Sequence, residues 1–148
     1  MDIFFQVIKE AQLRQVSKAG DPLENGLLDA FKGLRRLIGR YEGHFTAKMD
    51  FEGRYELWAV KGLIIEGRKR KEVFFASAII QSTYVGFYFM PVYVVDDMKA
   101  LFGELLLKLL KGRSCFHIKT LDEELEKQLS EALEKGFELY RQIGWTQD

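Results

Sequence analysis

The feature that most constrains this chain is an apolar stretch over residues 73–95 with a short polar interruption near its middle. Residues 72–80 and 84–92 are rich in aromatic and β-branched side chains, which favour strands. The Gln-Ser-Thr connection between them is short, and strands joined in this way pair antiparallel. Both faces of the two strands are apolar. The pattern therefore predicts the central pair of a sheet that helices cover on one face.

The same stretch is long enough to cross a membrane as a helix, which needs about 20 residues. Its polar residues and its strand pattern favour a buried core instead, so we expect no association with a membrane. The N-terminus lacks the basic start and apolar run typical of a signal peptide. The single cysteine, Cys115, cannot form an internal disulfide and suits a reducing compartment. We therefore expect a cytoplasmic protein.

The length of 148 residues is typical of one domain, and no repeat or linker divides the chain. We predict a single domain over residues 1–148 with a helical N-terminal extension over residues 1–20. Basic and acidic side chains balance at 22 each. Nucleic-acid binding draws much of its affinity from an excess of Lys and Arg, so this balance argues against a nucleic acid as partner.

Apolar residues at helical spacing precede the predicted central strands. We expect helices over residues 3–11 and 23–41, the second ending near Gly43, because glycine accepts the left-handed conformation common there. Alternating patterns predict further strands and turns before the central pair. The strands are expected over residues 45–49, 55–60 and 63–65, and the turns at residues 52–53 and at the basic residues 67–71.

A helix over residues 96–112 with an aspartate cap is expected after the central strands. A short strand over residues 114–119 follows. Thr120 and Glu123 have the spacing of a capping box at the start of the last helix. The predicted fold class is α+β, a single two-layer domain. In it, N-terminal helices precede a central antiparallel sheet of about five strands, and a helix, a short strand and a helix follow.

Three segments of the chain carry a family resemblance: residues 54–58 with 67–76, residues 84–93, and the glycine-basic-strand segment 110–119. They resemble the YdhG-like family (domain of unknown function 1801) over about residues 23–143. The motifs of that family are structural, so the resemblance implies a fold more than an activity. Some of its relatives are described as frataxin-like iron chaperones, which hold ferrous iron on an acidic surface. The resemblance therefore implies ferrous iron as a conceivable ligand.

Aromatic residues of the predicted sheet are the first candidate site. Tyr84, Tyr88 and Met90 share one face of a strand, and Trp58 lies on a neighbouring strand. Tyrosine and tryptophan offer apolar area together with a polar group, so this face is a candidate for binding a small ligand. It is equally suited to the surface of a homodimer. The plainer alternative is packing against a second layer of the protein.

Cys115 and His117 are the only neighbouring thiol and imidazole. Two residues apart on a strand, they point the same way, and Arg113 has the same parity. A thiolate nucleophile needs such a base and such a positive neighbour. The plainer interpretation is a buried cysteine beside a histidine without catalytic function, because cysteine is among the most buried residue types.

Glu131, Glu134 and Glu138 share one face of the acidic last helix. Carboxylate oxygens bind hard cations, so these residues are the candidate ligands for iron or another divalent metal. The alternative is a solvated charged face of an ordinary surface helix.

These features lead to three hypotheses of function. The first is a non-enzymatic binding module that holds an unidentified small molecule or protein on the aromatic face of the sheet. The second is a frataxin-like iron chaperone that uses the acidic last helix. The third is a cysteine-dependent enzyme. No cofactor is expected other than the ferrous iron of the second hypothesis.

Overall fold

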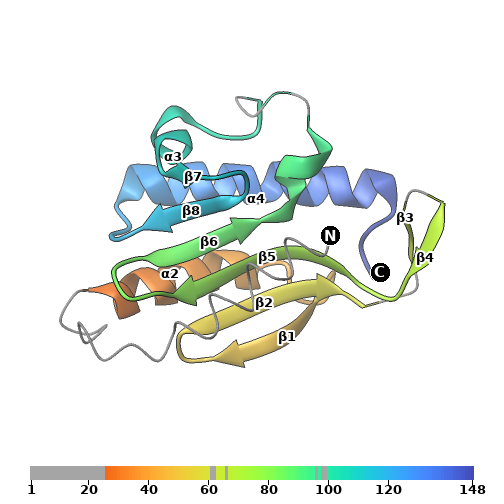
Figure 1. Ribbon diagram of the computed structural model, residues 1–148, viewed down its shortest axis with the longest axis horizontal. Coiled ribbons are helices and arrows are strands. Elements are labelled where there is room, and N and C mark those ends of the chain that lie inside the picture. The colour runs from red at the N-terminus through yellow and green to blue at the C-terminus, as the bar shows by residue number, and fades with distance from the viewer. Residues whose placement is uncertain (1–25, 61–62, 66, 96, 98–99) are drawn as a thin grey trace.

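The computed structural model describes residues 26–60, 63–65, 67–95, 97 and 100–148 (Figure 1). Its main sheet has six antiparallel strands in the order β1-β2-β5-β6-β8-β7. These strands are β1 (Thr46–Phe51), β2 (Arg54–Ala59), β5 (Val73–Ile80), β6 (Val85–Phe89), β8 (Cys115–Ile118) and β7 (Leu110–Lys111). Two long helices, α2 (Leu27–Gly39) and α4 (Glu123–Ile143), form the second layer. The α+β prediction is confirmed.

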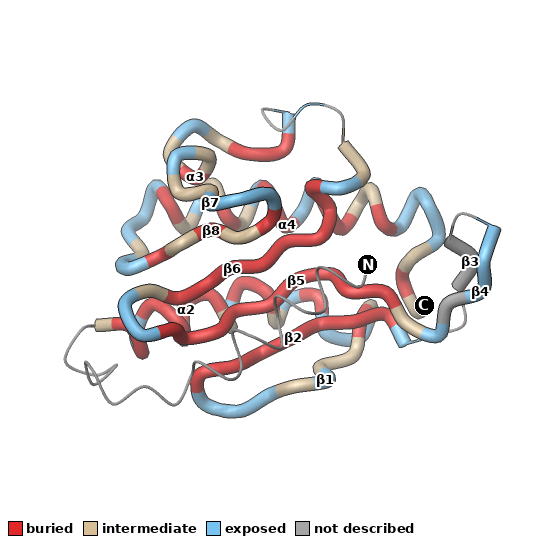
Figure 2. The backbone as a smooth tube through the Cα atoms, viewed as in Figure 1, coloured by how far each residue is buried: buried red, intermediate tan, exposed pale blue. Residues whose placement is uncertain are grey.

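β5 and β6 lie at the centre of the sheet, as the apolar pattern predicts. Every residue of both strands is buried, and so is every residue of β2 (Figure 2). An antiparallel strand at a solvent-facing position would alternate buried and exposed residues. Burial on both faces therefore explains why β5 and β6 lack the regular alternation of apolar and polar residues.

The two long helices cover the same face of the sheet, where aromatic rings form the core. Phe75 stacks on Phe45, with ring centroids 4.3 Å apart, and meets Tyr140 of α4 edge-on at 5.3 Å. Phe75 sits at an irregularity of β5, because Leu57 pairs with Ala76 whereas the next residue of β2 pairs with Phe74. A bulge of this kind turns one extra side chain toward the helices.

The strand predicted over residues 63–65 forms, but outside the main sheet. β3 (Leu63–Ile65) pairs with β4 (Arg68–Arg70) in a separate two-stranded sheet. The basic residues predicted as a turn are thus mostly a strand, and Gly67 makes the turn with φ of 76°. The main sheet has six strands where about five are expected, because β7 and β8 join its far edge while β3 lies outside it.

The helix predicted over residues 96–112 is wrong in length. Among the described residues of this range the α-helix is limited to α3 (Glu104–Lys108), with Gly103 as its N-cap in place of an aspartate. Leu106 N donates to Gln128 Oε1 of α4 at 2.9 Å, which fixes the start of α3 against the long helix. Its end is set by β7, because Leu110 pairs with Phe116 in the sheet. Residues 96, 98 and 99 lie outside the described residues.

The boundaries of several other elements differ from the prediction. Asp122, and not Thr120, caps α4, with its carboxylate accepting from Leu125 N at 2.8 Å. β6 ends at Phe89 and gives way to the 3-10 helix η1 (Met90–Val94), because Pro91 lacks the amide that a strand pair requires. The predicted helix over residues 3–11, the extension over residues 1–20 and the first residues of the helix predicted at 23–41 lie outside the described residues.

Within the described part of the chain, no helix combines the length and the apolar character that crossing a membrane requires.

Candidate functional site

The candidate site lies on the face of the sheet turned away from α2 and α4. Tyr55 marks the helix face, because the guanidinium of Arg35 from α2 lies 4.2 Å from its ring centroid. The residues on either side of Tyr55 point the other way, because side chains alternate along a strand. We call the side opposite the helices the second face.

A row of side chains crosses four strands on the second face. Glu56 of β2 pairs with Ser77 of β5, Ser77 pairs with Tyr88 of β6, and Tyr88 pairs with Cys115 of β8. Directly paired residues of antiparallel strands point to the same face with Cβ atoms about 4.5–5.5 Å apart. The register therefore places polar groups side by side in the middle of the sheet.

Arg54 belongs to the next row of the second face. It pairs with Ile79 of β5, which lies two residues after Ser77 and two residues before Gln81, so Arg54 is a diagonal neighbour of both polar residues. Diagonal neighbours are about 7–8 Å apart, within reach of a long side chain. We call Arg54, Glu56, Ser77, Gln81 and Tyr88 together the second-face cluster.

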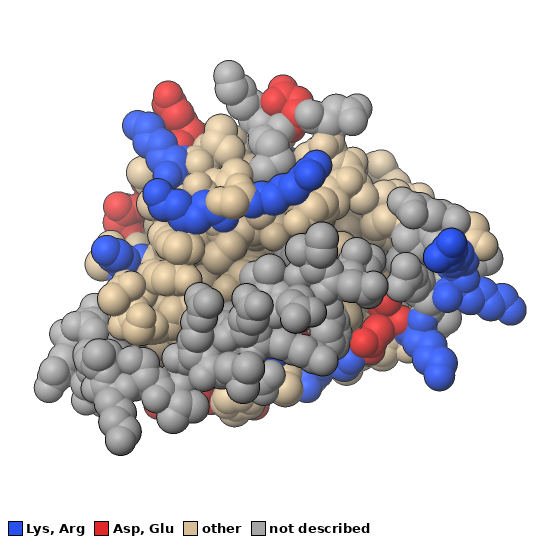
Figure 3. Space-filling view, viewed as in Figure 1, with Lys and Arg blue, Asp and Glu red and all other residues tan. Residues whose placement is uncertain are grey.

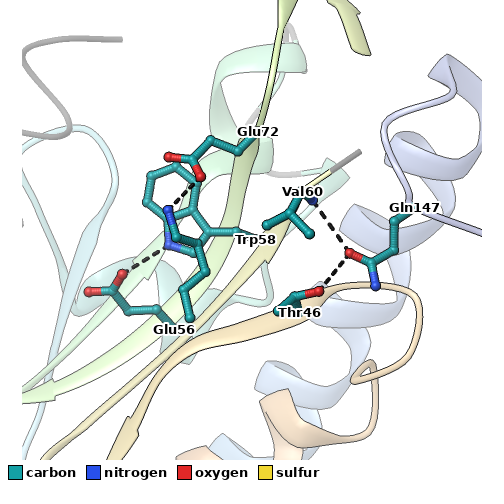
Figure 4. Close-up of polar contacts among 7 residues, drawn as sticks. Thr46, Glu56, Trp58, Val60, Glu72 and Gln147 are labelled. Atoms are coloured by element: carbon teal, nitrogen blue, oxygen red, sulfur yellow. Dashed lines mark hydrogen bonds and ion pairs between the residues drawn. The ribbon is translucent and has the colours of Figure 1, made fainter. Parts of the chain in front are cut away.

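Arg54 and Glu56 form a buried ion pair within this cluster. Arg54 Nε donates to Glu56 Oε2 at 2.7 Å, and Arg54 Nη2 contacts the same oxygen. Trp58 Nε1 donates to the other oxygen, Glu56 Oε1, at 2.9 Å (Figure 4). Both charged side chains are only 4% exposed. The carboxylate thus has a partner on each oxygen, and the pair carries no net charge.

Three polar groups of the cluster are buried and make no hydrogen bond with any described residue: Arg54 Nη1, Ser77 Oγ and Gln81 Nε2. Arg54 is 3% exposed, Ser77 0% and Gln81 5%. A buried polar group without a partner costs about 1–3 kcal/mol. Each such group in a folded protein needs an explanation, and these three all belong to the second-face cluster.

Tyr88 borders these groups with its ring lying along the strand. A Cβ atom at Gly86 would stand 2.8 Å from Tyr88 Cε2 and 3.3 Å from the hydroxyl oxygen, so only glycine leaves room for this ring position. Burial, followed by the neighbouring Cys115 thiol, raises the pKa of the Tyr88 phenol well above its ordinary value. The Gln81 side chain lies near the Tyr88 hydroxyl and lowers that pKa. The contact does not have the geometry of a hydrogen bond from Gln81 Nε2.

The aromatic residues proposed from the sequence are distributed over three places. Tyr88 and Trp58 both lie on the second face, but β5 separates their strands. Trp58 packs edge-on against Phe74 at 5.1 Å, and the Lys48 ammonium lies 4.7 Å from its ring centroid while pairing with Glu72 (Figure 4).

The other two aromatic-face candidates lie outside the strand. Tyr84 precedes β6 and stacks on His117, with ring centroids 3.7 Å apart and planes at 10°. Met90 begins η1 and is buried. The two residues that the structure places in the cluster's own strands are therefore Tyr88, which pairs with Ser77, and Trp58. Tyr84 lies next to Gln81, whose backbone N–H donates to the Tyr84 carbonyl at 2.8 Å.

Cys115 and His117 do share one side of β8, but their surroundings do not favour a thiolate. Burial raises the pKa of the Cys115 thiol to about 11, against a smaller lowering by its hydrogen bond with Tyr88. Arg113 lies outside β8, with its guanidinium 5.4 Å from the ring centroid of Tyr93. The His117 ring is occupied by Tyr84 on one face.

The surface around His117 is basic. Burial lowers the pKa of His117, and Lys111 and Lys119 lower it further because they repel a second positive charge. A row of Lys and Arg side chains follows β7 and β8 across this part of the molecule (Figure 3). The imidazole is therefore held in its neutral form in the physiological range.

The three glutamates proposed as metal ligands are not gathered at one point. Glu134 accepts a hydrogen bond from the Tyr41 hydroxyl at 2.8 Å, and Glu138 pairs with Arg141 at 2.9 Å. Glu131 is exposed on α4. Over the residues that the structure describes, no group of three or more His, Cys, Asp or Glu side chains is placed to hold a metal ion.

Sequence reasoning missed four residues of the second-face cluster: Arg54, Glu56, Ser77 and Gln81. The available indication was a polar residue inside a run that is otherwise buried on both faces. Ser77 interrupts the apolar β5, and Arg54 and Glu56 alternate with Tyr55 and Leu57 on β2. Their unpaired groups become visible only when the strands are placed in register.

Comparisons with known proteins give no match, whether with a protein-family model, a curated protein or a solved structure. The resemblance to the YdhG-like family therefore stays a prediction, and the functional conclusion depends on the second-face cluster.

Proposed function

We propose that this protein is a non-enzymatic binding module that holds a small molecule at the second-face cluster. The observation that carries the proposal is the group of three unpaired, buried polar groups on Arg54, Ser77 and Gln81. A ligand with hydrogen-bonding atoms would satisfy them at once. A small number of polar groups in an otherwise apolar environment is typical of small-molecule sites.

The chemistry of the cluster favours binding over catalysis. The Cys115 thiol has a pKa of about 11 and the Tyr88 phenol a pKa above its ordinary value, so both stay protonated at neutral pH. The Glu56 carboxylate is held on both oxygens. A general acid or base works best when its pKa lies near the working pH, and neither the Cys115 thiol nor the Tyr88 phenol meets that condition.

The cluster also costs the free protein more stability than an apolar alternative would. Alanine at position 77 or methionine at position 81 would fill similar space without an unpaired polar atom. Sites kept for binding are commonly destabilising for the unbound fold, because their polar groups are arranged for a ligand. The composition of the cluster is therefore more easily explained by binding than by stability.

The cluster ends near the protein surface at two neighbouring turns. Gln81 is followed directly by Ser82 and Thr83, which are exposed. Ile80 N donates to the carbonyl of Gly53 at 2.8 Å, so the β5–β6 turn lies beside the β1–β2 turn. A ligand would approach Arg54 and Gln81 from this end of the sheet.

The test is the variant Ser77→Ala, measured by thermal unfolding and by native mass spectrometry for a small molecule that copurifies with the protein. If Ser77 serves a ligand, the variant loses the bound molecule. The ligand-free variant is then more stable than the ligand-free wild type, with a melting temperature higher by about 2–4 °C for each kcal/mol recovered.

The matched control is Ser114→Ala, because Ser114 is also buried but its hydroxyl accepts from Tyr93. This control is expected to keep the bound molecule. A ligand-free Ser77→Ala variant that unfolds at a lower temperature than the ligand-free wild type would show that Ser77 is satisfied by the fold or by buried water. The proposal would then fail.

The iron-chaperone and thiol-enzyme hypotheses remain predictions. The contacts of Glu134 and Glu138, and the raised pKa of Cys115, give them no support.

A further inference from the structure

We propose that the ligand of the second-face cluster is an uncharged molecule with a carbonyl or amide oxygen, and not an anion. This inference rests on the function proposed above and deepens it. An exposed arginine would suggest an anionic ligand, because guanidinium binds carboxylate and phosphate well. Arg54 is different, since its charge is already neutralised inside the protein.

The charge balance of the cluster is the first argument. Arg54 gives two of its nitrogens, Nε and Nη2, to Glu56, and both side chains are nearly inaccessible to water. The neighbours on β1 that pair with these two residues are Phe51 and Met49, both apolar. An anion would therefore bring a second negative charge against one positive charge in a buried place. A buried charge without its own partner is strongly unfavourable.

The kind of hydrogen bond on offer is the second argument. Arg54 Nη1 and Gln81 Nε2 each carry two N–H donors and no acceptor, and Ser77 contributes a hydroxyl. Donors thus outnumber acceptors among the unpaired groups. An oxygen with two lone pairs and no formal charge, such as that of a ketone or an amide, can accept from two of these groups without disturbing the Arg54–Glu56 pair.

The apolar side chains around the cluster indicate that the rest of the ligand, beyond its oxygen, is apolar. Ile79 lies between Ser77 and Gln81 and is fully buried, and the ring of Tyr88 extends over Gly86, the residue paired with Ile79. An oxygen-bearing group placed at Arg54 would therefore continue into an apolar surface. A small aliphatic or aromatic amide fits this combination.

The experiment uses matched pairs of probes that differ only in charge: benzamide with benzoate, and isobutyramide with isobutyrate. Each is titrated into isotope-labelled wild-type protein, and binding is read from the NMR resonances of the Gln81 side-chain amide and the Ser77 backbone amide. The expected result is saturable shifts with each amide and affinity at least about tenfold weaker for each acid, the ratio that 1.4 kcal/mol corresponds to.

The variant Glu56→Gln sharpens the test, because it removes the negative charge that neutralises Arg54. In this variant the preference is expected to reverse, with benzoate binding more tightly than benzamide. The wild-type comparison stands by itself if the variant fails to fold.

The outcomes separate this inference from the proposed function. Acids that bind the wild type as tightly as their amides, at the same resonances, overturn the uncharged-ligand inference and leave the binding site intact. If neither member of either pair shifts these resonances, the inference and the proposed function both fail.

Discussion

Arg54 and Glu56 are two residues apart on β2, face the same side of the sheet, and pair with each other where each side chain is only 4% exposed. The alternation of a strand puts them on one face, and Trp58, two residues further on, adds its indole N–H to the same carboxylate. Three consecutive second-face positions of one strand thus form a single hydrogen-bonded unit. Its remaining donor, Arg54 Nη1, is the group on which the proposed binding site depends.

Breaking this pair is expected to destabilise the protein strongly. Arg54→Met or Glu56→Met leaves one buried charge without its partner, and the free energy of unfolding should fall by about 3–5 kcal/mol. The double variant Arg54→Met, Glu56→Met should recover most of that loss, because it removes both charges. Urea unfolding of the four proteins gives the coupling energy.

The control for the buried pair is the exposed pair Arg141 and Glu138 on α4, whose side chains are 61% and 37% exposed. Glu138→Gln should change stability by less than about 1 kcal/mol, because solvent screens this pair. If the substitution of Glu56 lowers the free energy of unfolding no more than Glu138→Gln does, the result contradicts the buried arrangement of Arg54 and Glu56.

Tyr140→Phe should destabilise the protein by about 0.5–1.5 kcal/mol, because it removes a buried hydrogen bond. The Tyr140 hydroxyl donates to the carbonyl of Phe74 at 2.7 Å, and both residues are fully buried. Chemical denaturation measures the difference. Tyr93→Phe is the control, because Tyr93 is 42% exposed and its hydroxyl reaches Ser114 only at 3.4 Å.

The contribution of Tyr140 should also depend on pH in a defined direction. Burial raises the pKa of its phenol well above the ordinary value, so the folded state keeps the proton in a range where the unfolded state loses it. The stabilisation is therefore complete below about pH 10 and declines as the pH rises further. The stability difference between wild type and Tyr140→Phe should shrink over that range, and a growing difference would count against the assignment.

Two helix glycines should respond oppositely to alanine. At Gly136 of α4 a Cβ atom would stand 2.5 Å from Phe89 Cζ and 2.8 Å from Pro91 Cγ, both in rigid rings of the core. The overpacking costs about 1–3 kcal/mol and should outweigh the gain of about 1 kcal/mol in helix propensity. Gly136→Ala is therefore expected to be destabilising.

Gly33 of α2 is the matched case, because its Cβ would meet only a terminal methyl of Leu121 at 2.7 Å. That side chain can turn away, so Gly33→Ala should be neutral or stabilising by up to about 1 kcal/mol. Melting temperatures of the two variants decide the matter. Equal effects at both positions would mean that α4 lies less closely on Phe89 than the structure shows.

The Cys115 thiol should react slowly at neutral pH. With its pKa at about 11, the rate of alkylation by iodoacetamide should keep rising with pH well beyond 8.5, where an ordinary cysteine is half ionised. Tyr88→Phe removes the hydrogen bond that lowers this pKa, so the rate profile should move to still higher pH. A midpoint at or below pH 8.5 in the wild type would restore the nucleophile hypothesis.

The candidate site was partly predictable from the sequence. The alternation of β6 correctly places Tyr88 opposite Phe87 and Phe89, which pack with Phe102 and Phe116 on the helix side. It also places Cys115 and His117 on one side of β8. The polar partners of Tyr88 were not predictable, because Ser77 belongs to another strand and its neighbour is fixed by the pairing of β5 with β6.

The sequence by itself determined the elements whose pattern is local and long: the central strands β5 and β6, the amphipathic helices α2 and α4, and the α+β class. Periodicity reports which side of an element is apolar, and over many residues that information is unambiguous. It carries nothing about which neighbour each side meets.

Only the tertiary structure decided the features that depend on contacts between distant segments. The hydrogen bond to Gln128 of α4 fixes the start of α3. Leu110 pairs with Phe116 in the sheet and therefore does not continue the helix. In the same way, strand register brings Arg54, Ser77 and Gln81 together as buried donors. A buried polar group stabilises the fold when it has a hydrogen-bond partner and destabilises it when it has none. Which partner it meets is set by the pairing of distant segments.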